Sequence, residues 1–161
     1  MKNDIDIVQI GKDLITEESN ALIKLRDRLD SSFNSAVNLI SKSKGRVIII
    51  GLGKSGIIGR KIAATFNSTG TIASFIHASD ALHGDLGSLE LQDIVLFISK
   101  SGNTEELVRL IPILKEFKSP LIAIVGNVDS FIAKNKPVIK STKKIVFNIR
   151  ENFIISLPVI D

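Results

Sequence analysis

Residues 51–56 (Gly-Leu-Gly-Lys-Ser-Gly) combine a glycine-rich segment with a lysine and a serine, and these residue types could bind an anion. Glycines let backbone N–H groups approach an anion closely, and the start of the helix expected after them adds a partial positive charge. Lys54 adds a full charge and Ser55 a hydroxyl. The pattern predicts an anion site, with a ligand-free turn between a strand and a helix as the alternative.

Two nucleotide-binding patterns fit this segment only in part. Gly51, Gly53 and Gly56 satisfy G-x-G-x-x-G. However, the acidic residue expected about 20 positions later, at the end of the second strand, is missing, and that strand ends at His77. A Walker A loop needs a glycine five residues before Gly53, where Ile48 stands. Nucleotide binding is therefore not favoured.

A second polar segment, residues 99–104 (Ser-Lys-Ser-Gly-Asn-Thr), precedes another expected helix. Its hydroxyl groups belong to Ser99, Ser101 and Thr104. Hydroxyl and N–H groups at the start of a helix form a cup that suits phosphate. Glu105 and Glu106 open the helix, where acids also interact favourably with the helix dipole. The residues alone favour this helix-dipole role for Glu105, and they do not decide between it and a catalytic role for Glu106.

A third segment, residues 77–87, places two histidines and two aspartates within nine positions. The chain has no cysteine and only these two histidines, so neither a thiolate metal site nor a multi-histidine centre is expected. His83 and Asp85 are too few ligands to predict a metal. A loop histidine is more often a hydrogen-bonding group than a metal ligand.

These segments need a scaffold, and the chain supplies one. Buried strand patterns occur at residues 46–50, 72–76, 93–98, 120–125 and 144–149, and helical patterns alternate with them. This alternation predicts an α/β fold, a three-layer sandwich in which helices flank a parallel five-stranded sheet. Ligands of such sheets bind beyond the carboxyl ends of the strands, so the three polar segments are expected to lie side by side.

A long helical pattern precedes the sheet, over residues 4–43. Thr16 is the expected N-cap, followed by acids in the first turn, and no glycine or proline interrupts the pattern from there to Lys44. A shorter helix, over residues 5–14, is expected before the one that begins at Thr16. The apolar positions step by three or four: Leu22, Leu25, Leu29, Phe33, Val37 and Ile40. A long helix outside a sheet suggests packing on a second subunit.

Composition limits the class of protein. With 161 residues, 44% of them hydrophobic and 24% charged, the chain is expected to form one packed domain. It has no apolar run of membrane-spanning length and no signal-peptide pattern, so a cytoplasmic location is expected. The net charge of +4 arises largely from five lysines within residues 134–144. Without Trp or Tyr beside them, these lysines do not predict nucleic-acid binding.

Taken together, residues 51–66, 68–70, 83–87 and 99–102 strongly resemble the sugar isomerase (SIS) domain family. Within it the chain is most similar to the arabinose-5-phosphate isomerases of the KpsF/GutQ type, over about residues 5–135. The resemblance implies a flavodoxin-like fold and the isomerisation of arabinose 5-phosphate to ribulose 5-phosphate through an enediol. That reaction feeds 3-deoxy-manno-octulosonate synthesis for the bacterial outer surface. The resemblance also implies a cytoplasmic homo-oligomer, a tetramer in the family, that needs no organic cofactor.

The same resemblance implies roles for individual residues. The family's phosphate-binding positions correspond to Ser55, Ser99, Ser101 and Thr104. Lys54 matches an active-site lysine that could stabilise enediolate charge. Glu106 matches an active-site glutamate and is a candidate for proton transfer. His83 matches the histidine of the family's H-G-D-L-G segment, at the edge of the site.

The last residues depart from the family pattern. Residues 1–150 are expected to form a SIS domain that is incomplete at its C-terminal end, and residues 151–161 a tail similar to a fragment of a CBS repeat. The family's histidine and second glutamate have no counterpart here, although Glu151 could replace the latter. A sugar-phosphate-binding module without catalysis, or a truncated remnant, is therefore the alternative to an active isomerase.

Overall fold

The computed structural model describes residues 6–134 and 144–148. The chain divides into two compact units, one of residues 30–150 and one that contains residues 1–29 and 151–161. The predicted tail at residues 151–161 and most of the lysine-rich stretch lie outside the described residues. Among the described residues, no helix has the length and apolar character needed to cross a membrane.

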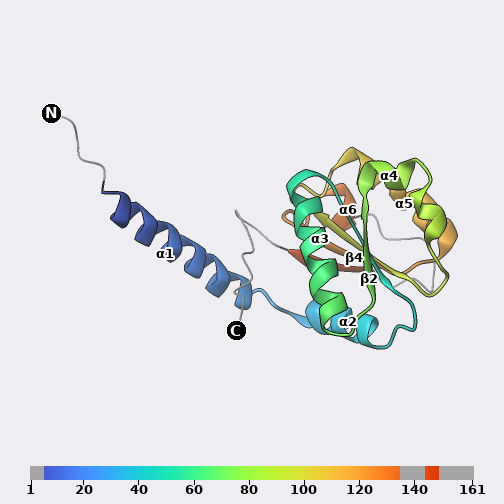
Figure 1. Cartoon of the computed structure of the whole chain (residues 1–161), viewed down its shortest axis with the longest axis horizontal. Helices are drawn as coiled ribbons and strands as arrows, with labels where there is room; N and C mark the ends of the chain where they lie inside the picture. The colour runs from blue at the N-terminus through green and yellow to red at the C-terminus, as the bar shows by residue number, and fades with distance from the viewer. Residues whose placement is uncertain (1–5, 135–143, 149–161) are drawn as a thin grey trace. The chain divides into compact units, whose positions relative to one another are not determined.

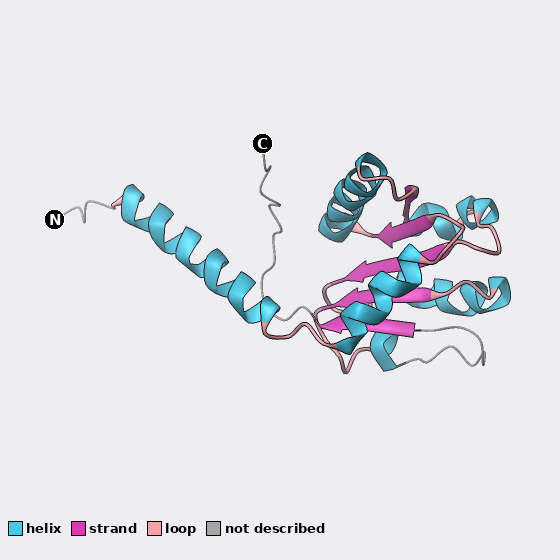
Figure 2. Ribbon diagram, turned by 90° about the horizontal axis from the view of Figure 1, so that it is seen from below, coloured by secondary structure: helices cyan, strands magenta, loops and turns pink. Residues whose placement is uncertain are grey.

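The predicted parallel five-stranded sheet is present (Figure 2). Its strand order is β2-β1-β3-β4-β5. The strands are β1 (Val47–Gly51), β2 (Ala73–His77), β3 (Ile94–Ser99), β4 (Leu121–Val125) and β5 (Lys144–Asn148). Their limits differ from the predicted ones by one residue at most. The sequence patterns locate them because β1 and β3 are almost continuously apolar and buried, which is typical of parallel strands covered on both faces.

Helices cover both faces of this sheet (Figure 1). On one face lie α2 (Ser31–Ser41) and α3 (Gly53–Ser68). On the other lie α4 (Ala78–Leu82), the 3-10 turn η1 (Asp85–Ser88), α5 (Glu105–Phe117) and α6 (Phe131–Lys134). Alternate residues of β1 enter the two cores: Val47 and Ile49 contribute to the first face, Ile48 and Ile50 to the second. The predicted three-layer architecture is confirmed.

An ion pair between the half-buried Arg46 and the buried Asp93 joins the amino ends of β1 and β3. Asp93, immediately before β3, is fully buried and accepts hydrogen bonds from the Arg46 backbone N–H at 2.8 Å and its Nη2 at 2.7 Å. The Glu90 N–H donates to the same carboxylate, and Arg46 Nη2 also donates to the Ser88 carbonyl at 2.7 Å. Burial raises the pKa of Asp93, but these hydrogen bonds outweigh it and the net pKa is lowered.

The N-terminal helices differ from the prediction. Helix α1 (Ile7–Arg26) begins after the N-cap Asp6, and Thr16 lies in its middle, where its hydroxyl donates to the Lys12 carbonyl at 2.8 Å. The expected N-cap at Thr16 and the unbroken helix to Lys44 are therefore wrong. Helix α2 starts separately because the Asp30 carboxylate accepts the Ser32 N–H at 2.8 Å and caps a new helix. This cap also lowers the pKa of Asp30.

Candidate functional site

The three polar segments leave the sheet at the same edge. Gly51, the last residue of β1, pairs with His77 of β2 on one side and with Ile98 of β3 on the other. The chain passes from β1 outward to β2 and then returns to the other side of β1 as β3, so the strand order reverses between β1 and β3. Ligand crevices of open α/β sheets form at such a reversal, outside the carboxyl ends of the strands.

The first segment turns directly from β1 into α3. The turn is tight: a Cβ on Gly51 would lie 3.0 Å from the carbonyl of Ser55, and Gly53 has a φ of 55°. The N-cap residue, Leu52, makes no side-chain cap, so the first N–H groups of this 16-residue helix have no partner within it. Lys54 is exposed and Ser55 is half-buried beside these N–H groups.

The second segment, residues 99–104, carries hydroxyls of two kinds. Ser99 is 2% exposed, and its Oγ lies 2.8 Å from Thr104 Oγ1 and accepts the Gly102 N–H at 3.0 Å. Ser101 is exposed, and its Oγ accepts the Asn103 N–H at 3.1 Å. Ser99 and Thr104 therefore close the loop internally, whereas Ser101 presents its hydroxyl to solvent.

Helix α5 begins beside this loop with free N–H groups. Thr104 is its N-cap residue but makes no side-chain cap, and its hydroxyl contacts Ser99 instead. Glu105 forms an ion pair with Arg109 one turn later, which agrees with a role in stabilising the helix and not in binding a ligand. Glu106 is half-buried and, within the described part of the chain, makes no hydrogen bond or ion pair. Its carboxylate is available to a ligand.

The third segment reaches this edge through β2. His83 is exposed at the end of α4, where its N–H donates to the Asp80 carbonyl at 2.9 Å. His77 ends β2 and stands in register with Gly51, a position that the sequence showed only as the end of a strand. Over residues 6–134 and 144–148, no three acidic or histidine side chains gather in a way that could hold a metal ion.

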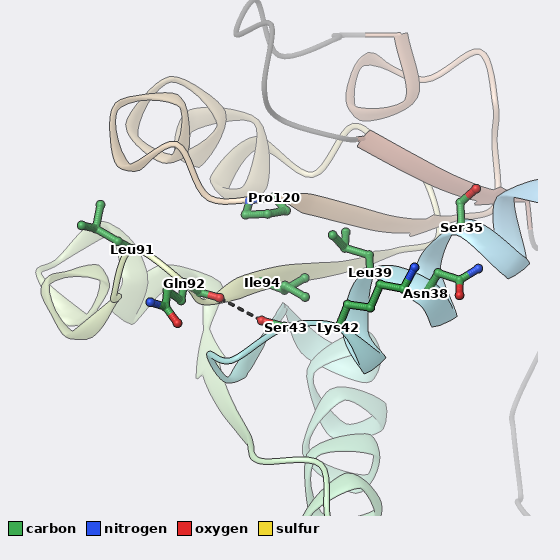
Figure 3. A pocket seen from close by; sticks show the side chains of 9 residues that line it. All are labelled: Ser35, Asn38, Leu39, Lys42, Ser43, Leu91, Gln92, Ile94 and Pro120. Carbon is green, nitrogen blue, oxygen red and sulfur yellow. Dashed lines mark hydrogen bonds between the residues drawn. The ribbon is translucent and has the colours of Figure 1, made fainter.

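A pocket of about 650 Å³ lies at the opposite edge of the sheet (Figure 3). Its lining includes Leu39 and Lys42 of α2, Ile94 at the start of β3, and Pro120 just before β4. Ser43 and Gln92 also line it, and the Ser43 hydroxyl donates to the Gln92 carbonyl at 3.0 Å. The amino ends of the strands carry none of the predicted site residues, so this pocket is separate from the candidate site.

The sheet order and the helices on both faces define the chain as a doubly wound α/β domain. A family model described as "SIS domain" matches residues 39–152. The chain belongs to the SIS domain family, as its motifs predicted.

Curated relatives match over most of this chain. A probable arabinose 5-phosphate isomerase of Haemophilus influenzae is 46% identical over 131 residues, which is 81% of this chain and 39% of that protein. The arabinose 5-phosphate isomerase KpsF of Escherichia coli O6:H1 is 48% identical over 122 residues, 75% of this chain and 37% of its own length. The chain thus spans about two fifths of the length of the curated relatives it matches.

A solved structure shares the fold closely. A protein of Escherichia coli CFT073, determined in complex with arabinose 5-phosphate, superposes with a TM-score of 0.82 at 35% sequence identity. The match covers 93% of this chain and 76% of the other. That protein of Escherichia coli CFT073 therefore binds arabinose 5-phosphate.

Proposed function

We propose that this chain binds a phosphosugar at the β1–β3 edge and interconverts arabinose 5-phosphate and ribulose 5-phosphate. The observation that carries the proposal is the convergence of two uncapped helix starts, α3 and α5, at the point where the strand order reverses. Both helices direct free N–H groups and the positive ends of their dipoles to this edge, which suits a phosphate dianion. We choose arabinose 5-phosphate as the sugar because the curated relatives are named arabinose 5-phosphate isomerases.

Phosphate is assigned to the hydroxyls and N–H groups of the two loops. Ser55 and Ser101 contact it directly in this proposal. Ser99 and Thr104 shape the cup from behind, because their hydroxyls are already bonded to each other. Lys54, exposed at the first turn of α3, adds the full positive charge that either a phosphate or an enediolate oxygen needs.

The isomerisation moves one proton from C2 to C1 of the sugar and another between the two oxygens, so it needs no change in oxidation state overall. Glu106 is the proposed base that takes the carbon-bound proton and returns it to the neighbouring carbon. Its half-buried carboxylate at the start of α5 lies on the same helix end as the phosphate cup. His83, on the exposed turn after α4, is assigned to the edge of the site, where it could contact the sugar hydroxyls.

The alternative is a module that binds a phosphosugar without turning it over. One observation favours it: within the described residues, no second carboxylate or imidazole is hydrogen-bonded to Glu106. Ring opening and proton transfer are helped by a positioned acid–base pair. We further propose, from the family resemblance, that the protein is a cytoplasmic homo-oligomer that serves 3-deoxy-manno-octulosonate synthesis.

One experiment separates the two functions. Ribulose 5-phosphate formation from arabinose 5-phosphate is followed on purified protein, and thermal unfolding is recorded on the same samples with and without the sugar. An isomerase gives both turnover and ligand stabilisation, because a ligand that binds the folded state raises its unfolding temperature. Stabilisation without turnover identifies a binding module, and no response to the sugar refutes both functions.

The role of Glu106 is tested by Glu106→Gln. The amide keeps the size of the side chain but cannot accept the proton, so turnover is expected to fall by at least about 100-fold. Binding of arabinose 5-phosphate should remain within a few-fold of wild type. The matched control is Glu105→Gln, one residue earlier, which should retain activity. If Glu106→Gln turned over substrate at the wild-type rate, Glu106 would have no catalytic role and would only interact with the helix dipole.

A further inference from the structure

The segment after β4, residues 126–132, lies against the loop of residues 99–104. The Gly126 N–H donates to the Lys100 carbonyl at 3.0 Å and extends the ladder in which Ser99 pairs with Val125. Further along, the Ile132 N–H donates to the Gly102 carbonyl at 3.0 Å. We call residues 126–132 the bracing segment, because it holds the loop from one side along its length.

Gly102 and Ser130 meet so closely that no side chain fits between them. Gly102 is buried with a φ of 65°, and a Cβ on it would lie 2.0 Å from Ser130 Oγ. Ser130 is 2% exposed and is fixed in turn, because its hydroxyl donates to the Asn127 carbonyl at 2.6 Å. The loop therefore rests on a rigid support at its middle.

Asn103 links the bracing segment to Ser101, whose hydroxyl is a candidate phosphate-binding group. Its Oδ1 accepts the Phe131 N–H at 2.7 Å, 28 residues away in sequence. Its own N–H donates to Ser101 Oγ at 3.1 Å. One residue thus contacts the support through its side chain and orients the exposed hydroxyl of Ser101 through its backbone. Asn103 is itself exposed, so burial of its side chain does not explain this arrangement.

We infer that Asn103 is a positioning residue for phosphate binding: the carboxamide, held by the bracing segment, fixes the direction of the Ser101 hydroxyl. The inference rests on the proposed phosphosugar function. Hydrogen bonds to a phosphate depend on donor direction, so a donor that turns freely binds more weakly than one held in place. Asn103 acts through Ser101 and does not itself touch the ligand.

A double-mutant cycle tests this inference. Asn103→Ala, Ser101→Ala and the double variant are titrated with arabinose 5-phosphate and, separately, with inorganic phosphate. Asn103→Ala is expected to weaken both affinities by about tenfold, the effect of one well-directed hydrogen bond. The double variant should bind only slightly more weakly than Ser101→Ala, because residues that act through one contact are not additive. Asn38→Ala, on α2, is the matched control and should bind as wild type.

The readouts separate a positioning role from a structural one. The ligand-free unfolding temperature of Asn103→Ala should stay close to that of wild type, because the residue is exposed. Wild-type affinity in Asn103→Ala, or strictly additive losses in the double variant, would overturn the inference while leaving the phosphate site intact. If wild type binds neither probe, the proposed function fails and the positioning role fails with it.

Discussion

The hydroxyl of Ser101 is open to solvent, whereas that of Ser99 is enclosed by its own loop. The two serines are only two positions apart and look alike in the sequence. Their difference follows from Gly102, whose left-handed backbone turns the chain so that its N–H points back to Ser99 Oγ. At the residue scale, then, loop geometry decides which side chains can reach a ligand.

Removing a hydroxyl from either helix start should weaken binding. Ser101→Ala and Ser55→Ala each remove one hydrogen bond to a charged group, worth about 1.5–3 kcal/mol, which is roughly 10- to 100-fold in Kd for arabinose 5-phosphate. Isothermal titration calorimetry measures the change. The control is Ser68→Ala, at the far end of α3, whose hydroxyl only donates to the Thr65 carbonyl. Unchanged affinity in both Ser101→Ala and Ser55→Ala would remove the phosphate assignment.

Much of the candidate site follows from the sequence, and the rest depends on contacts between distant residues. The glycine turn at residue 51 and the loop after β3 are predictable from residue types alone, because glycine, lysine and hydroxyl groups at helix starts have a clear chemical meaning. The contact of Asn103 with Phe131 has no such signal. The two residues are 28 positions apart and meet only because β3 and β4 are neighbours in the sheet.

At the scale of elements, the ion pair of Arg46 and Asp93 ties β1, β3 and the turn η1 together. Asp93→Asn keeps the shape of the side chain but removes its charge. It should lower the free energy of unfolding at pH 7 by about 1.5–3 kcal/mol, the value of a hydrogen bond to a charged group. Urea denaturation measures this, with the exposed Asp13→Asn on α1 as a control that should change little.

The same pair gives a pH dependence of known sign. The pKa of Asp93 is lower in the folded state than in the unfolded chain, so the unfolded state takes up its proton first as the pH falls. The contribution of Asp93 is therefore complete above the usual carboxyl pKa of about 3.9 and is lost as the pH drops below it. The wild-type and Asp93→Asn stability curves should converge over that acid range. Parallel curves would contradict the assignment.

The elements themselves are predictable to different degrees. All strands are located to within one residue, and the pattern is strongest for β1, β3 and β4, whose nearly continuous apolar runs are buried. The break between α1 and α2 is not predicted, since neither glycine nor proline marks it. The signal is present in Asp30 followed by Ser31 and Ser32, a short side chain before the first helical turn that can cap it. Capping competes with helix continuation, and periodicity alone does not show which prevails.

At the scale of the whole molecule, the exposed apolar residues of α1 lead us to expect self-association. No residue of α1 is buried. Its exposed large apolar side chains lie mostly on one side of the helix: Ile7, Val8, Ile10, Leu14, Ile15, Leu22 and Ile23. Such a face normally marks an interaction site. We expect purified protein to form a homo-oligomer and Leu14→Asp to lower its mass in size-exclusion chromatography with light scattering.

The matched control for that experiment is Asn20→Asp, which adds the same charge to the polar side of α1 and should leave the oligomer intact. Both variants should keep a cooperative thermal transition, because neither residue contributes to the buried core. A monomeric wild type, or an equal response of the two variants, would exclude the apolar face as the contact.

Strand β3 lies between β1 and β4 with Val95, Leu96 and Phe97 buried, and its carboxyl end leads directly into the loop of residues 99–104. A strand enclosed on all sides exposes its backbone only when the entire domain opens, whereas outer elements open by local fluctuations. The loop therefore starts from the part of the molecule that opens last. A ligand bound there would make global opening of the whole domain less favourable, and not only the opening of the loop. It would therefore raise protection from hydrogen exchange at residues far from the phosphate.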